Sequence, residues 1–110
     1  MADLVARTAL GGRSQSFGAI AMREGPAGAD EAASGLAFIE LTGTGTLDLL
    51  AIGSLARGRE GELVTRLSAL RVRIGWRRRP VESARVAVDR FSADYLWEWL
   101  AHKARIETES

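Results

Sequence analysis

The most regular stretch of the chain alternates apolar and polar residues over positions 70–77. Such alternation predicts a β-strand with one face in the core and the other in solvent. The apolar face would carry Leu70, Val72, Ile74 and Trp76, and the opposite face would carry Arg71, Arg73, Gly75 and Arg77. Residues 84–90 repeat this period, and Pro80 lies in the turn between the two stretches. The two stretches therefore predict a hairpin.

Three further segments have an extended pattern. Residues 36–41 place apolar side chains on both faces, which is typical of a central strand. Residues 17–23 predict a shorter strand, and residues 62–66 predict a short extended piece. A turn of small residues, 42–46, then leads into a predicted helix at 47–52. We expect the chain to alternate between strands and short connections up to the final helix.

The predicted helix at 47–52 has signals at both ends. Thr46 is a candidate N-cap, and Gly53 is well placed to stop the helix. Gly43 and Gly45 before this helix suggest a phosphate loop of the dinucleotide-binding type. The third glycine of that fingerprint would fall at Asp48, whose carboxylate would repel a pyrophosphate. We therefore interpret the segment as a tight turn.

The order strand, strand, helix, strand, strand, helix predicts an α+β fold, with two helices on a small antiparallel sheet. Residues 25–35 are rich in glycine, alanine and charged residues and predict a flexible linker. We accordingly divide the chain into residues 1–35, comprising an arm, the short strand and the linker, and residues 36–110, a single α+β domain.

The last predicted helix begins at Ser92 as N-cap and ends near Arg105. Its apolar surface is about twice as wide as the stripe, on the order of 100°, that a helix needs to cover one sheet. Trp97 and Trp99 lie about 160° apart around the helix axis. We predict that the helix is sandwiched between its own sheet and another protein, with Trp97 facing the partner. The candidate interface residues are Trp97, Trp99, Leu100, Arg71, Arg73 and Arg77.

Charge and composition narrow the function classes. The chain has 15 basic and 14 acidic residues and a net charge of +1, so no global field draws it to nucleic acid or membrane. There is no cysteine, which excludes disulfides, thiolate nucleophiles and cysteine-ligated metals within this sequence. The first residues lack the apolar core of a signal peptide, and no run is long enough to span a bilayer. We expect a cytoplasmic protein.

Candidate catalytic groups are scarce. His102 is the single histidine, and it lies late in the last helix without an accompanying nucleophile signature. We interpret it as a helix-end residue that either caps carbonyls of the last turn or pairs with Glu98. The sequence therefore predicts no catalytic, cofactor-binding or metal-ligating residue in this chain.

The densest charge cluster is the arginine run at 71–79. Arginines on a sheet face can bind RNA or other anions. Trp76 alternates onto the opposite face, however, and cannot serve as a stacking platform among Arg71, Arg73 and Arg77. We favour a solvated face or a face docked on an acidic partner, and keep a free-standing RNA- or anion-binding module as the alternative.

The segment RFSADYLWEWL, residues 90–100, resembles the C-terminal part of gamma subunits of heterotetrameric sarcosine oxidase and related N-methyl amino acid oxidoreductases. Residues 36–55 and 66–79 are similar to that family in layout, so the resemblance covers about residues 36–105. Family members are longer and commonly carry a proline where this chain has Thr44. The chain resembles a shortened relative.

The resemblance implies a fold related to the folate-binding aminomethyltransferase domain. It implies a non-catalytic accessory subunit that stabilises a flavin-dependent sarcosine or N-methyl amino acid oxidoreductase. The partners would be alpha and beta flavoprotein subunits and a small zinc-binding delta subunit. FAD, FMN, NAD and tetrahydrofolate would be bound in those partners and none of them in this chain. A small independent enzyme or folate binder is the remaining alternative.

Overall fold

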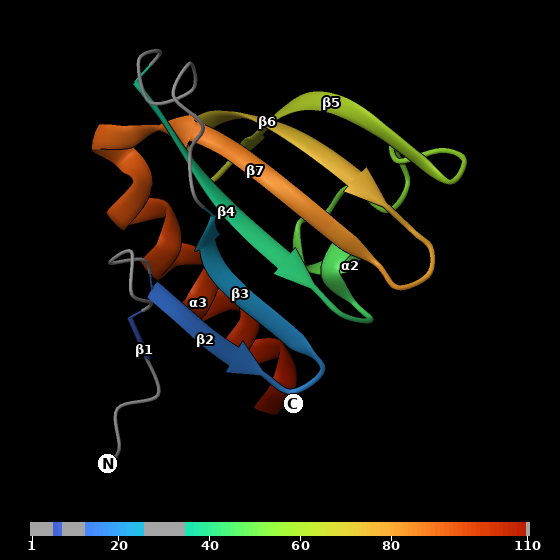
Figure 1. Ribbon diagram of the computed structural model, residues 1–110, viewed down its shortest axis with the longest axis horizontal. Coiled ribbons are helices and arrows are strands. Elements are labelled where there is room, and N and C mark those ends of the chain that lie inside the picture. The colour runs from blue at the N-terminus through green and yellow to red at the C-terminus, as the bar shows by residue number, and fades with distance from the viewer. Residues whose placement is uncertain (1–5, 8–12, 26–34, 110) are drawn as a thin grey trace.

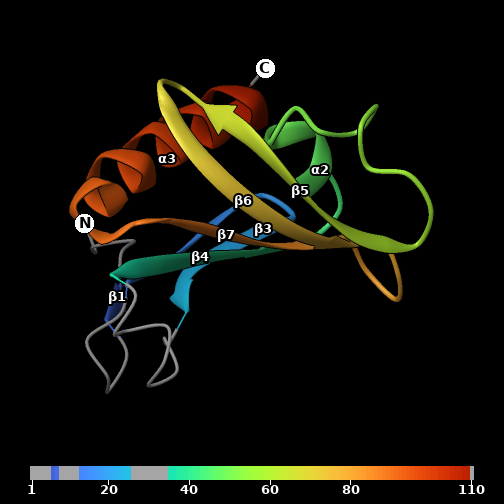
Figure 2. The same ribbon diagram turned by 90° about the horizontal axis from the view of Figure 1, so that it is seen from above.

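A computed structural model describes residues 6–7, 13–25 and 35–109. These residues form one antiparallel sheet of seven strands in the order β1-β2-β3-β4-β7-β6-β5. The strands are β1 (Ala6–Arg7), β2 (Arg13–Phe17), β3 (Ile20–Gly25), β4 (Leu36–Thr42), β5 (Glu60–Leu67), β6 (Leu70–Arg77) and β7 (Ser83–Asp89). The helices are α2 (Thr46–Leu49), the 3₁₀ turn η1 (Arg90–Ser92) and α3 (Ala93–Glu109). Both α2 and α3 lie on one face of the sheet (Figures 1 and 2).

The α+β class and the antiparallel sheet with two helices are confirmed. β4 lies between β3 and β7, as its apolar residues on both faces predicted. β6 and β7 form the predicted hairpin, with Ile74 opposite Val86. The predicted alternation is also correct. Of its core-facing members, Leu70 is half-buried, and the others are buried: Val72, Ile74, Trp76, Ala84, Val86 and Val88.

The N-terminal segment differs from the prediction. The single strand expected over residues 17–23 is two strands, β2 and β3, joined by a turn at Gly18 and Ala19. Phe17 and Ile20 on either side of this turn both enter the core, because they are directly paired across the two strands. β3 also pairs with β4. The sheet therefore runs across the predicted division at residue 35. Of the predicted linker at 25–35, Gly25 is the last residue of β3, Gly35 directly precedes β4, and residues 26–34 lie outside the described residues.

Helix α2 is shorter than predicted and is capped differently. Gly45, in the left-handed conformation, precedes its first residue, Thr46. The Thr46 hydroxyl donates to the carbonyl of Gly43 at 2.7 Å and does not cap the helix. The Leu47 amide instead donates to the Glu82 carboxylate at 3.1 Å. The helix ends at Leu49, so Gly53 does not terminate it.

Gly43 shows why the turn after β4 needs a residue without a side chain. Its φ is +133°, and a Cβ there would lie 1.8 Å from the carbonyl oxygen of Ala19. The turn after β4 thus packs directly against the β2–β3 turn, which glycine alone permits.

Helix α3 also begins differently from the prediction. Ser92 directly precedes the first residue of α3 but is the last residue of η1, and the side-chain cap that the structure shows is that of η1, where Asp89 accepts a hydrogen bond from the Phe91 amide at 3.2 Å. The side chains of α3 that meet the sheet are Ala93, Leu96, Trp97, Leu100, Ala101 and Ala104. They lie i, i+3 and i+4 apart, which places them on one side of the helix. The core of the protein lies between this side of α3 and the sheet.

Candidate interaction surfaces

The side of α3 that faces away from the sheet carries large apolar side chains. We define the outer ridge as Phe91, Tyr95, Trp99 and Ile106. The exposed fractions are 86% for Phe91, 53% for Tyr95 and 53% for Ile106, while Trp99 is half-buried. Phe91 lies in η1 just before α3, whereas Tyr95 and Trp99 lie four residues apart in α3 and are neighbours on its surface. Such clustered exposed aromatics are typical of protein-binding surfaces.

Trp97 and Leu100 do not belong to this surface, which corrects two of the predicted interface residues. Trp97 is 1% exposed and Leu100 is fully buried. The cause is that the alanines of α3 lie on the same side as Trp97 and let the helix approach the sheet closely. Trp97 and Trp99 do lie on different sides of the helix, but Trp97 is the one in the core.

An ion-pair network centred on Arg13 helps to hold Trp97 in place. The Arg13 guanidinium lies 4.8 Å from the centre of the Trp97 ring. It also pairs with Glu24 at 2.9 Å and with Asp94 at 2.7 Å. Burial opposes the charge on Arg13, yet the hydrogen bond and charge of Glu24, with those of Asp94, outweigh it and raise the pKa of Arg13. This network links β2 and β3 to α3.

The ridge itself is held in place by polar contacts beneath it. The Tyr95 hydroxyl lies 2.6 Å from the Ser68 hydroxyl in the β5–β6 turn. Lys103 lies 5.4 Å from the centre of the Trp99 ring, and its ammonium donates to the Leu49 carbonyl at 2.6 Å. Two of the ridge aromatics are therefore positioned before any partner arrives.

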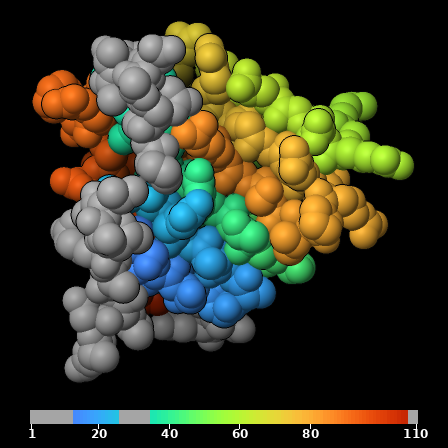
Figure 3. All heavy atoms as spheres, viewed as in Figure 1, coloured from blue at the N-terminus to red at the C-terminus, as the bar shows by residue number. Residues whose placement is uncertain are grey.

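The other face of the sheet forms a second surface, which is not covered by α2 or α3 (Figures 2 and 3). We call it the open face. Arg71, Arg73 and Arg77 are exposed on it, as the alternation predicted. Trp76 points away from it into the core and is 6% exposed, also as predicted.

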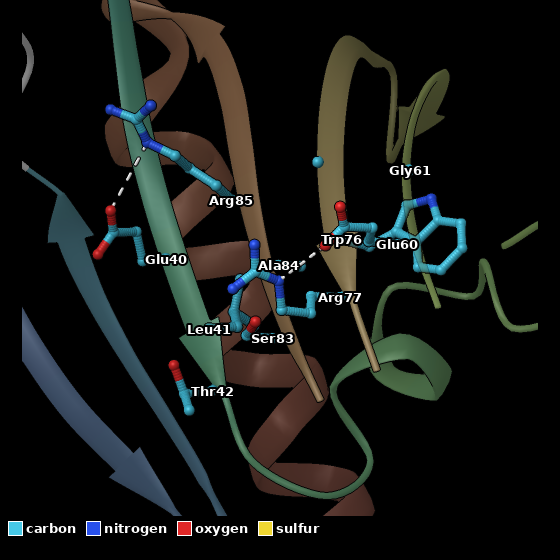
Figure 4. Close-up of a pocket in the computed structure, with 11 residues that line it drawn as sticks. Glu40, Leu41, Thr42, Glu60, Gly61, Trp76, Arg77, Ser83, Ala84 and Arg85 are labelled. Atoms are coloured by element: carbon cyan, nitrogen blue, oxygen red, sulfur yellow. Dashed lines mark hydrogen bonds and ion pairs between the residues drawn. The ribbon is translucent and has the colours of Figure 1, made fainter. Parts of the chain in front are cut away.

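A groove of about 610 Å³ crosses part of the open face (Figure 4). Its charged side chains are paired with one another: Arg77 with Glu60 at 3.1 Å, and Arg85 with Glu40 at 3.6 Å. The Arg85 guanidinium also lies 3.8 Å from the centre of the Phe38 ring. Ser83 lines the groove, but none of the lining residues is a histidine or lysine that could act as its general base.

The last two residues of the arginine run, Arg78 and Arg79, lie in different surroundings. Arg78 donates to the carbonyls of Gly58 at 3.1 Å and of Ala56, and so holds the loop before β5. Arg79 is exposed in the β6–β7 turn. Arg78 is a structural residue that the charge pattern alone did not separate from its neighbours.

The described residues lack the features of a dinucleotide site and of a metal site. Helix α2 is four residues long with Asp48 in its first turn, which does not fit a dinucleotide pyrophosphate. No group of three or more His, Asp or Glu side chains in the described part of the chain is placed to hold a metal. His102 is exposed on α3. Within residues 6–7, 13–25 and 35–109, no helix is long and apolar enough to cross a membrane.

Comparisons of the chain with family models, with curated proteins and with solved structures gave no match.

Proposed function

We propose that this chain is a non-catalytic, gamma-type accessory subunit of a cytoplasmic, multi-subunit flavin-dependent oxidoreductase that acts on sarcosine or related N-methyl amino acids. The resemblance of residues 90–100 to gamma subunits supports the identity of that assembly. The outer ridge carries the proposal that the chain works as a subunit. The same short segment supplies core residues on one side and exposed aromatics on the other.

The energetic argument concerns Phe91 above all. Burying a phenylalanine side chain is worth about 1.5–3 kcal/mol, and this chain leaves Phe91 86% exposed. Tyr95 and Ile106 add further exposed apolar surface in the outer ridge. Aromatic anchors of this kind dominate protein interfaces. A partner that covers the ridge would gain this burial without any change in the chain's own core.

In this proposal the redox chemistry belongs to the partners. Alpha and beta flavoprotein subunits would bind FAD, FMN, NAD and tetrahydrofolate, and a delta subunit would bind zinc. The chain's own fold would be a relative of the folate-binding aminomethyltransferase domain, used here for assembly. The carboxylates that line the groove beside Arg77 are paired with arginines, Glu60 with Arg77 and Glu40 with Arg85, and this pairing supports a structural role for them.

The test is co-expression with alpha and beta flavoprotein subunits of a heterotetrameric sarcosine oxidase, followed by affinity purification through a tag on this chain. We expect the flavoprotein subunits to co-purify in fixed ratio, and the chain purified alone to be colourless and inactive. The double variant Phe91→Ser, Ile106→Ser should lose them. Leu55→Ser is the matched control, because Leu55 is an exposed apolar residue, 58% exposed, away from the ridge.

Two results would contradict the proposal. One is a stoichiometric flavin spectrum or amine oxidation by the isolated chain. The other is undiminished co-purification of the Phe91→Ser, Ile106→Ser variant, provided that its thermal melt matches that of the wild type.

A further inference from the structure

The groove beside Arg77 is one part of a longer depression on the open face. A second hollow of about 300 Å³ shares Gly75 and Arg85 with it. A third hollow, of about 310 Å³, shares Leu36, Arg73 and Ala87 with the second. Together they follow the strand direction from Arg77 to Arg71, a length on the order of 20 Å at about 3.3 Å per residue. We call this depression the face groove.

Gly75 forms the floor in the middle of the face groove. It lies inside β6, flanked by Arg73 and Arg77 and paired across the sheet with Arg85 and Glu62. A Cβ at Gly75 would meet no atom within 4 Å, so the space above its backbone is open. A glycine inside a strand weakens the strand and often marks a place where another backbone approaches closely.

Arg71 and Arg73 at one end of the face groove, and Arg66 beside them, form no ion pair with an acidic side chain among the described residues. Arg66 and Arg71 are direct cross-strand partners, and Arg73 follows two residues along the same face. Like charges placed opposite each other in a sheet are destabilising. This arrangement is therefore costly in the free chain and becomes favourable when carboxylates lie between the guanidinium groups.

Apolar side chains lie between these arginines. Val64 is 51% exposed and Leu36 is 37% exposed, and both line the hollow beside Arg71 and Arg73. A ligand for this end must offer carboxylates to the arginines and aliphatic groups to the floor. We infer that the face groove binds an extended segment of another protein in which acidic and aliphatic residues alternate, lying over Gly75 with its carboxylates on Arg71 and Arg73. This inference does not depend on the identity of the assembly proposed above.

A protein segment fits the groove better than a single-stranded nucleic acid. Sequence-tolerant binding of single strands depends on aromatic rings on which bases stack. The Phe38 ring is 7% exposed and lies under the Arg85 guanidinium, and Trp76 faces the core.

The test uses the full chain and a fluorescein-labelled peptide of alternating glutamate and valine, long enough to span about six residues of strand. Binding is followed by fluorescence anisotropy at low and at physiological salt. We expect saturable binding that weakens with salt. The double variant Arg71→Glu, Arg73→Glu should bind at least about tenfold more weakly. Arg79→Glu makes the same kind of charge reversal in the β6–β7 turn and should change the affinity less than about twofold.

Gly75→Val separates binding from folding. The added side chain fills the space above the strand, so the peptide affinity should fall by at least about tenfold. Because valine has a higher strand propensity than glycine, the melting temperature of the Gly75→Val variant should equal or exceed that of the wild type. Thermal melts by circular dichroism accompany every variant, and oligouridine and a lysine–valine peptide serve as competing probes.

Three outcomes would overturn the inference: no saturable binding of the acidic peptide, equal binding by the folded Arg71→Glu, Arg73→Glu variant, or tighter arginine-dependent binding of oligouridine. Failure here would leave the proposed subunit role standing, because that role rests on the outer ridge and is tested by co-purification.

Discussion

The inner and outer sides of α3 both carry a tryptophan among other apolar side chains, yet the rest of the chain covers only the inner side completely. Trp97 is 1% exposed, whereas Phe91 and Tyr95 on the outer side are 86% and 53% exposed. The inner side has alanines that let the helix approach the sheet, and Arg13 closes over Trp97 at 4.8 Å. On the outer side, the Tyr95 hydroxyl lies 2.6 Å from the Ser68 hydroxyl, Lys103 lies over the Trp99 ring, and Trp99 is only partly buried against the core. Apolar character alone therefore does not decide which side of α3 enters the core. The alanines on the inner side and the neighbouring strand β2, which carries Arg13, decide it.

The largest effect should come from the inner side. Trp97→Ala should lower the free energy of unfolding by about 3–5 kcal/mol, because it leaves a large cavity in the core. Urea denaturation followed by circular dichroism measures this change. Trp99→Ala is the matched control on the other side of the helix and should lower the free energy of unfolding clearly less. Equal losses for the two variants would contradict the division of α3 into two sides.

The outer side should show the opposite behaviour. Phe91→Ala should weaken binding to the partner assembly by about 2–4 kcal/mol if Phe91 is an anchor. The free energy of unfolding of the free chain should stay within about 0.5 kcal/mol of wild type, since the side chain contacts little of the core. Calorimetric titration measures the first quantity and urea denaturation the second. A large loss of stability with intact binding would reverse the assignment.

Arg13 joins β2 and β3 to the inner side of α3, and its removal should have an intermediate effect. Arg13→Ala removes the pairs with Glu24 and Asp94 and the stacking on Trp97. We expect the free energy of unfolding to fall by about 1–2 kcal/mol, since hydrogen bonds to charged groups are worth more than exposed pairs. Arg23→Ala is the control, because the Arg23–Glu40 pair is more exposed and should be worth less than about 1 kcal/mol. A larger loss from Arg23→Ala would show that the Arg13 network is not what joins β2 to α3.

The sequence predicted the strands in which the alternation of apolar and polar residues determines the face of the sheet that each side chain occupies. Strand β6 was predicted with its bounds and both faces, because alternation over residues 70–77 admits a single register. β4 was recognised as central from apolar residues on both sides. The β2–β3 turn was missed, because Gly18 and Ala19 interrupt the alternation by only two residues. The turn is visible only once Phe17 and Ile20 are known to be paired.

The interface was harder to predict because it depends on which side of α3 meets the sheet. The rotation of a helix by about 100° per residue correctly placed the two tryptophans on different sides. It did not say which side is inner, and Trp97 was assigned wrongly. The spacing of Ala93, Ala101 and Ala104 around Trp97 was the available signal. The contribution of Arg13 could not be found this way, because it lies 84 positions before Trp97 and reaches it only through the pairing of β2 with β3.

The smallest predicted effect concerns the open face, where stability and binding should oppose each other. Arg66 and Arg71 are cross-strand partners on an exposed face. Arg66→Glu replaces a repelling pair with an attracting one and should raise the free energy of unfolding by about 0.2–1 kcal/mol at low salt. The gain should shrink as salt screens the pair. Arg57→Glu, at an exposed loop position, makes the same charge change without a cross-strand partner, so the difference between the two variants isolates the local term. Denaturation at two salt concentrations measures it. If Arg66→Glu instead lowers the free energy of unfolding relative to Arg57→Glu, the arginines do not repel one another. The inference that the face groove binds carboxylates then loses its electrostatic basis.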